Sequence, residues 1–286
     1  MEFLVSTDLD GTLLDHHTYS WHAAIPAIEL CKEQKIPIIF NTSKTADEVR
    51  TLQKQIGISG SMIVENGSAL TFSINSLKPV NMKNNDFFEK IQSLPDSPAI
   101  KIQNTQITSI FGALREDILG FIKDIRQETS WQFEGFSDWS LEQIIANTDL
   151  SHQAAKDASR KLFSEPFIWN DEQQYLDLFI QLAKQAGLQV LKGGRFFHLQ
   201  GDTNKAKPLL WLKQLIGEFS RETELKLICL GDNHNDIDML NIADYPVCVR
   251  SPVANFPKLK KNKTPLYTNL EGPHGWNQAI LDILQR

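Results

Sequence analysis

The chain begins with a short apolar strand that ends in two carboxylates, and this feature constrains its fold most. Residues 3–7 read Phe-Leu-Val-Ser-Thr, and Asp8-Leu9-Asp10-Gly11-Thr12 follows directly. Side chains two apart on a strand point the same way, so Asp8 and Asp10 leave the strand end as a pair. Gly11 permits a sharp turn close to whatever the pair holds. Two carboxylates at the carboxyl end of a parallel strand suit a nucleophile, an acid/base and a magnesium site.

Length and composition restrict the class of protein. A chain of 286 residues suits one large or two moderate domains, and its net charge of −6 argues against nucleic acid as a partner. No apolar run reaches the length of a membrane span, and no secretory signal is visible. The three cysteines, none of them in a C-x-x-C motif, indicate reduced thiols in the cytosol. We therefore expect a cytoplasmic protein with a small-molecule partner and no membrane or nucleic-acid partner.

Strands and helices alternate in the first and last parts of the chain. Expected strands cover residues 2–8, 36–40, 62–64, 225–230 and 246–249, and expected helices cover 26–34, 45–57, 203–215 and 276–285. Thr45 and Glu48 form a capping box that begins the second of these helices. Such alternation predicts a parallel sheet with helices on its faces.

The middle of the chain has a different pattern, with longer helical stretches and weaker strands. We expect residues 82–195 to form an inserted α+β domain, and residues 1–81 and 196–286 to form the α/β core.

Three further polar clusters lie at strand ends or at a helix start. Asn41-Thr42-Ser43-Lys44 follows an apolar strand, and Gly231-Asp232-Asn233-His234-Asn235-Asp236 follows another. Lys205 lies in the opening turn of a predicted helix, where the helix dipole disfavours a cation unless an anion is present. Taken one at a time, these residues also fit an N-cap, a polar loop and a surface lysine. Together they fit an anion and hard-cation site at the carboxyl edge of the sheet.

These clusters, in this order, resemble the signature of the haloacid dehalogenase superfamily of phosphohydrolases. The signature is D-x-D-G-T, then Thr or Ser after a strand, then Lys, then G-D-x-x-N-D, and the chain carries it at 8–12, 42, 205 and 231–236. The resemblance implies a Rossmann-like core with a parallel sheet. The long insertion before Lys205 matches the members that have a C2-type cap domain.

A narrower resemblance extends through both the core and the insertion. Five segments are similar to the mannosyl-3-phosphoglycerate phosphatase family, namely 41–45, 65–67, 164–167, 193–199 and 272–277. This resemblance implies dephosphorylation of mannosyl-3-phosphoglycerate to mannosylglycerate by a phosphoric monoester hydrolase.

The resemblance also implies roles for individual residues. Asp8 would attack phosphorus and form an aspartyl-phosphate, Asp10 would act as acid and base, and Thr42 and Lys205 would hold phosphoryl oxygens. The implied Mg²⁺ ligands are Asp8, Asp10, Asp232 and Asp236. The implied substrate-binding residues are Ser43, Lys44, Glu165, Gly194, Arg195 and Asn235. Of these, Arg195 would pair with a substrate carboxylate and Glu165 would accept sugar hydroxyls.

Several alternatives remain open at this stage. The substrate can be another sugar phosphate, such as glucosyl-3-phosphoglycerate or sucrose phosphate. A phosphomutase or phosphotransferase uses the same fold but passes the phosphoryl group to a second hydroxyl. An inactive binding protein would be expected to lack Asp8 or Asp10, and the chain has both.

Overall fold

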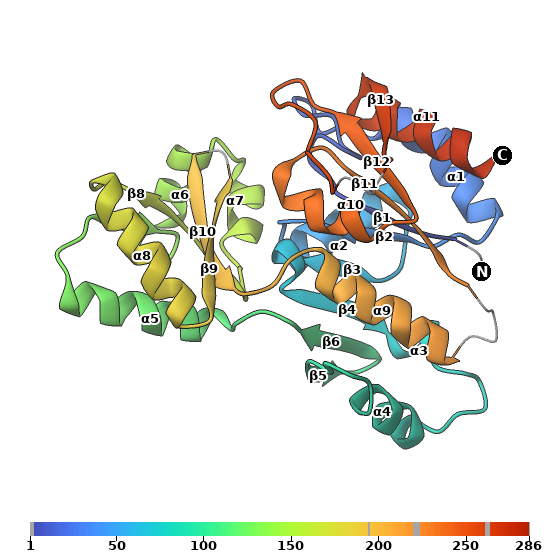
Figure 1. The fold of residues 1–286 in the computed structure, drawn as a ribbon, viewed down its shortest axis with the longest axis horizontal. Coiled ribbons are helices and arrows are strands. Elements are labelled where there is room, and N and C mark those ends of the chain that lie inside the picture. The colour runs from blue at the N-terminus through green and yellow to red at the C-terminus, as the bar shows by residue number, and fades with distance from the viewer. Residues whose placement is uncertain (1–2, 194, 220–223, 261–263, 286) are drawn as a thin grey trace.

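A nine-stranded sheet forms the centre of the larger part of the molecule (Figure 1). A computed structural model describes residues 3–193, 195–219, 224–260 and 264–285. In spatial order the strands are β13 (Leu266–Glu271), β12 (Tyr245–Arg250), β11 (Lys226–Gly231), β1 (Phe3–Thr7), β2 (Ile38–Asn41), β3 (Met62–Val64), β4 (Ala69–Ser73), β6 (Gln106–Ile110) and β5 (Ala99–Gln103).

The six strands from β13 to β3 are parallel, and β4, β6 and β5 extend the sheet in antiparallel fashion. The chain moves outward from β1 to β3 on one side, and from β11 to β13 on the other. The boundary between β1 and β11 is therefore the point at which the strand order reverses, where open α/β sheets bind their ligands. The expected parallel sheet with helices on its faces is confirmed.

Helices cover both faces of this sheet. One apolar cluster joins one face to α1 (Ile25–Glu33), α2 (Ala46–Ile56) and α11 (Gly272–Leu284). A second cluster joins the other face to α4 (Asn84–Gln92), α9 (Ala206–Phe219) and α10 (Ile237–Ile242), with the short α3 (Ile74–Leu77) beside it. Near-continuous burial along β1, β2 and β11 follows from this double cover, because each strand has a helix layer above and below it.

A second, four-stranded antiparallel sheet lies beside the first part and is joined to it by two crossings of the chain (Figure 1). Its order is β7 (Phe133–Gly135), β8 (Ser164–Trp169), β10 (Phe196–Gly201) and β9 (Leu188–Gly193). An aromatic-rich cluster packs this sheet against α5 (Arg115–Glu128) and α8 (Gln173–Gln185). A smaller cluster joins α6 (Leu141–Thr148) and α7 (His152–Ala158). We call residues 115–201 the cap, and the rest of the chain the core.

The strand pairings differ from the expected domain boundaries at both ends. Residues 99–110, expected in the insertion, form the hairpin β5–β6, which pairs with β4 at the edge of the core sheet. Residues 196–201, expected in the core, form β10 and pair with β8 and β9. An antiparallel edge hairpin carries the same alternating pattern as a strand of a separate α+β domain, so only pairing partners distinguish the two.

Local signals in the sequence explain several element ends. The Thr45 hydroxyl accepts a hydrogen bond from the Glu48 amide, and the Glu48 carboxylate accepts one from the Thr45 amide at 2.8 Å. Gly57 ends α2 in the left-handed conformation at φ +70°. The predicted capping box and the predicted end of this helix are both confirmed.

The turn after β3 brings the core close to the segment that returns from the cap. Three short 3-10 turns occur among the described residues, at His22–Ala24, Glu65–Gly67 and His234–Asp236. In the second of these, Gly67 has φ +90° and its carbonyl accepts a hydrogen bond from the Thr203 hydroxyl at 3.0 Å. A Cβ at position 67 would overlap the backbone of Asn204, so this close approach requires glycine.

No helix among the described residues combines the length and the apolar character that a crossing of the bilayer requires.

We predict that Gly67→Ala lowers the free energy of unfolding by about 2–4 kcal/mol, because it adds both backbone strain and overlap with Asn204. Gly120→Ala in α5 is the matched control, since a Cβ there meets no atom within 4 Å. That control should stabilise the protein by at most about 1 kcal/mol. Urea denaturation of both variants measures the difference, and equal stabilities would contradict the close approach at Gly67.

Candidate active site

Three carboxylates from two strand ends meet at the carboxyl edge of the sheet. Asp8 directly follows β1, while Asp232 and Asp236 lie in the loop and 3-10 turn after β11. One oxygen from each carboxylate lies within 4.8 Å of the others, and all three residues are buried. Gly11 makes room for this cluster, because a Cβ at that position would lie 2.7 Å from Asp232 Oδ2.

The ammonium of Lys205 lies inside this cluster. Its side chain is 0% exposed, and Nζ lies 2.6 Å from Asp8 Oδ1 and 2.7 Å from Asp236 Oδ1. The backbone carbonyl of Lys205 accepts a hydrogen bond from Asn41 Nδ2 at 2.9 Å, which ties the segment before α9 to the end of β2. A cation at a helix start is unfavourable on its own, and the carboxylates explain why it is tolerated here.

The acids outnumber the cations at the site, and their pKa values respond to this. Burial, opposed by Lys205 and assisted by the charge of Asp236, raises the pKa of Asp8 well above its usual value. Burial and then Asp236 raise the pKa of Asp232 to about 6. Each shift reflects a preference for less negative charge, which a bound divalent cation would also satisfy.

Asp10 and the residues after β2 complete the catalytic set expected from the sequence. Lys44 Nζ lies 2.9 Å from Asp10 Oδ2. The other oxygen of Asp10, Oδ1, is buried and has no hydrogen-bond partner among the described residues. Thr42 is fully buried, and its hydroxyl accepts a hydrogen bond from the Lys44 amide at 3.2 Å. Ser43 faces the same cavity as Asp8 and Asp10.

The oxygen-rich donor set fits a hard divalent cation such as Mg²⁺. Asp8 and Asp232 are the carboxylates best able to act as direct ligands. Asp236 is more fully engaged, because Oδ1 accepts from Lys205 and Oδ2 accepts from the amides of Asp232 and Asn233. Its geometry fits an anchor for Lys205 and for the loop that carries Asp232.

A cavity of about 260 Å³ lies over these acids and is closed partly by the cap. On the core side Asn66 and the loop 233–235 line it, and Asn235 Nδ2 donates to Asn66 Oδ1 at 3.1 Å. Asn235 is thus at the site, where it holds Asn66. On the cap side the lining residues are Leu191, Lys192 and His198.

Lys192 and His198 are site residues that the sequence analysis missed. Both belong to the β9–β10 hairpin, and the sequence already singled out the turn of that hairpin through Gly193, Gly194 and Arg195. The pairing register, rather than the motif itself, determines which hairpin residues reach the cavity. Gly194 lies outside the described residues.

Two substrate-binding residues expected in the cap have other partners. The Arg195 side chain is 56% exposed, is not among the residues that line the cavity, and forms an ion pair with Asp149 at 2.7 Å. Glu165 is fully buried; its carboxylate accepts from Arg115 Nε at 2.8 Å and from the Ser137 amide at 2.6 Å. Strand alternation turns Glu165 into the cap interior, where it needs these partners, so it is not placed to bind sugar hydroxyls.

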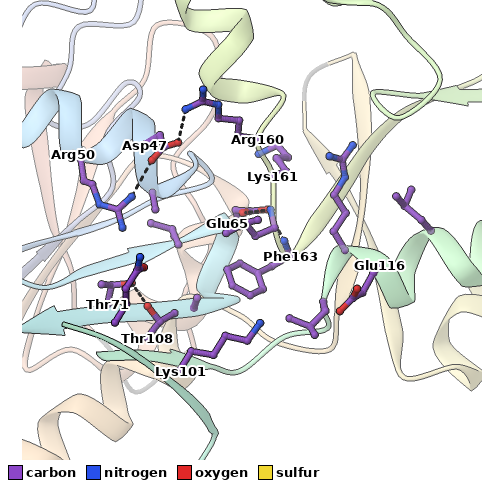
Figure 2. Close-up of a pocket in the computed structure, with 18 residues that line it drawn as sticks. Asp47, Arg50, Glu65, Thr71, Lys101, Thr108, Glu116, Arg160, Lys161 and Phe163 are labelled. Atoms are coloured by element: carbon purple, nitrogen blue, oxygen red, sulfur yellow. Dashed lines mark hydrogen bonds and ion pairs between the residues drawn. The ribbon is translucent and has the colours of Figure 1, made fainter. Parts of the chain in front are cut away.

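Figure 2 shows the junction between core and cap, beside a second cavity of about 630 Å³ that none of the acids of the cluster lines. The Glu65 carboxylate accepts from the amides of Leu162 and Phe163 and, at 2.6 Å, from the Ser164 hydroxyl. Nearby, Asp47 binds Arg50 at 2.9 Å and Arg160 at 3.2 Å.

The junction connects directly to the cavity over the acids. Glu65 and Asn66 are adjacent and both have positive φ, +47° and +57°. Such strained backbone persists only where surrounding contacts hold it. Glu65 accepts hydrogen bonds from the cap segment 162–164, and Asn66 accepts one from Asn235. This turn therefore connects the cap to the loop that carries Asp232 and Asp236.

Comparison with known proteins agrees with this geometry. A family model described as haloacid dehalogenase-like hydrolase matches residues 5–265. The chain belongs to this family. Two relatives named glucosyl-3-phosphoglycerate/mannosyl-3-phosphoglycerate phosphatase are each 34% identical to it. The one from Methanococcoides burtonii aligns over 99% of this chain and 98% of its own length, and the one from Persephonella marina over 98% and 97%.

A solved structure supports the same fold. The sucrose-phosphatase of Synechocystis sp. superposes with a TM-score of 0.58, covering 99% of this chain and 98% of its own, at 14% identity. With the family match and the named relatives, the chain is a phosphatase of the haloacid dehalogenase family with a cap domain.

We predict that, in the absence of divalent metal, the free energy of unfolding of this phosphatase falls as pH rises from 4 to 7. The folded-state pKa of Asp232, about 6, exceeds the ordinary 3.8, so its contribution is fully present below 3.8 and is lost as pH rises through 6. In EDTA, the unfolding free energy of wild type relative to Asp232→Asn should fall by roughly 2 kcal/mol over this range. Mg²⁺ should reverse the fall in the wild type. A pH-independent difference would contradict the charge excess at the site.

Proposed function

We propose that this phosphatase is a Mg²⁺-dependent, cytoplasmic enzyme that removes the phosphate from a glycosyl-3-phosphoglycerate, with mannosyl-3-phosphoglycerate as the preferred substrate and the glucosyl compound as the alternative. The buried group of Asp8, Asp232, Asp236 and Lys205 beneath a cap-covered cavity is the observation that supports the reaction. The two relatives that align over nearly the whole chain support the substrate class.

In this proposal Asp8 is the nucleophile. It lies at the end of a central strand with its backbone held by the sheet, since its amide donates to the Leu230 carbonyl at 2.9 Å. One carboxylate oxygen is engaged by Lys205, which leaves the other to attack phosphorus and form an aspartyl-phosphate. Lys205 also favours the ionised form of Asp8 against the effect of burial.

Asp10 is proposed as the acid and base. Its Oδ2 is held by Lys44, and its buried Oδ1 has no partner among the residues described, so this oxygen is the one available to exchange a proton. It would protonate the leaving alkoxide and later remove a proton from the water that hydrolyses the aspartyl-phosphate.

The remaining site residues would stabilise charge on the phosphoryl group. Thr42 offers a hydroxyl just after β2, Lys205 offers an ammonium just before α9, and the Ser43–Lys44 segment offers further donors before α2. Asp8 and Asp232 would hold Mg²⁺, with Asp10 beside them and Asp236 as their anchor. When bound, the metal would neutralise repulsion between the phosphate and the acids.

We predict that Asp8→Asn lowers phosphate release by at least roughly 10³-fold, because an amide cannot serve as the nucleophile. The melting temperature should change little, since an amide also accepts a hydrogen bond from Lys205. Asp171→Asn is the control. Asp171 belongs to the cap, where its carboxylate accepts a hydrogen bond from the Gln132 amide, and it makes no contact with the acid cluster. Mass spectrometry after labelling with phosphate or beryllofluoride should detect modification at Asp8; labelling of another carboxylate would exclude the assignment.

The substrate is tested by phosphate release from mannosyl- and glucosyl-3-phosphoglycerate, sucrose phosphate and simple sugar phosphates in Mg²⁺ and in EDTA. The proposal expects the highest kcat/KM on a glycosyl-3-phosphoglycerate and loss of activity in EDTA. Preference for sucrose phosphate, or transfer of phosphate to added sugar instead of water, would contradict it.

A further inference from the structure

Among the described residues that line the cavity over the acids, Lys192 is a lysine that forms no ion pair with a carboxylate of the protein. Lys205 is bound by Asp8 and Asp236, and Lys44 is bound by Asp10. Lys192 reaches the same cavity from the end of β9. Its Nζ lies over the Phe197 ring, 5.6 Å from the ring centroid, and no carboxylate among the described residues lies within ion-pair distance of it.

A second ammonium, that of Lys161, lies beside this cavity but lines the larger cavity at the junction rather than this one. Lys161 is only 8% exposed, and its Nζ donates to the Ser43 carbonyl at 3.3 Å without an ion pair to any carboxylate among the described residues. It lies between α7 and β8, in the part of the cap that meets Glu65 of the core (Figure 2). Burial and the charge of Lys161 lower the pKa of His198 to about 3, so this imidazole is neutral at physiological pH.

The charges of the cavity are therefore separated between floor and wall. The floor carries the acids, with Lys205 bound to Asp8, and the cap wall carries Lys192 and the uncharged His198. A phosphate at Asp8 is bound by the floor residues. An anion at the cap wall must accordingly be a different group of the same substrate.

We propose that Lys192 forms an anion-binding subsite on the cap that pairs with the carboxylate of the substrate. The inference rests on the proposed function, because a phosphoglycerate unit carries a carboxylate on the same three-carbon skeleton as its phosphate ester. It also reassigns the role expected for Arg195, which belongs to the same hairpin but is already paired with Asp149 on the surface.

Two small phosphate esters test the subsite without any sugar. 3-Phosphoglycerate and glycerol 3-phosphate differ only by a carboxylate in place of a hydroxymethyl group. Their inhibition constants are measured against p-nitrophenyl phosphate hydrolysis at saturating Mg²⁺. The variants are Lys192→Gln, Lys192→Arg and, as the matched control on the same hairpin, Arg195→Gln.

A charge-assisted contact predicts that the wild type binds 3-phosphoglycerate roughly ten-fold or more tightly than glycerol 3-phosphate. Lys192→Gln should bring this ratio close to one, because glutamine keeps most of the length of the side chain but carries no charge. Lys192→Arg should keep most of the preference, and Arg195→Gln should keep all of it.

Three results would overturn the subsite: no preference for 3-phosphoglycerate in the wild type, an unchanged ratio in Lys192→Gln, or an equal loss for both inhibitors, which would indicate a role in cap structure. Failure of the proposed function is a separate result. In that case neither glycosyl-3-phosphoglycerate is hydrolysed, while the ratio of the two inhibition constants still reports on Lys192.

Discussion

The site depends on the paired contacts that the buried ammonium of Lys205 makes with two carboxylates. The ammonium lies between the carboxylates of Asp8 and Asp236, which come from the ends of two adjacent parallel strands. Asp236 in turn accepts hydrogen bonds from the amides of Asp232 and Asn233. The ion pair with Lys205 therefore also fixes the conformation of the loop after β11. Removing this ammonium would leave two buried carboxylates without their counter-ion, which is strongly destabilising. The residues proposed for catalysis are therefore also residues that hold this part of the core together.

The strained turn after β3 connects the acid cluster of the core with the cap. Glu65 is held by the cap segment 162–164, Asn66 is held by Asn235, and Gly67 lies against the segment that leads to Lys205. Segment 162–164 leads into β8, which pairs with β10 of the hairpin, and from this hairpin Lys192 and His198 face the cavity. The proposed division of labour, with phosphate on the core and the second anion on the cap, follows from this geometry.

Much of the core site could be predicted from the sequence. Asp8, Asp232, Thr42 and Lys205 each follow or precede a recognisable strand or helix, and parallel strands bring their carboxyl ends to one edge. The unfavourable position of Lys205 at a helix start was itself a signal, and the carboxylates around it give the reason. The cap residues offered no such rule: Arg195 and Glu165 have the right chemistry for sugar-acid binding, yet their nearest partners are Asp149 and Arg115.

The sequence by itself determined the alternation of strands and helices, the capping of α2 and the convergence of the acids that follow β1 and β11. These features depend on local periodicity and on a general property of parallel sheets. Only the tertiary structure decided that residues 99–110 join the core sheet, that β13 lies at its other edge, and that Lys192 rather than Arg195 faces the acids. The reason is the same in each case. Partner strand and register result from long-range contacts, and a hairpin residue changes face with a shift of one position.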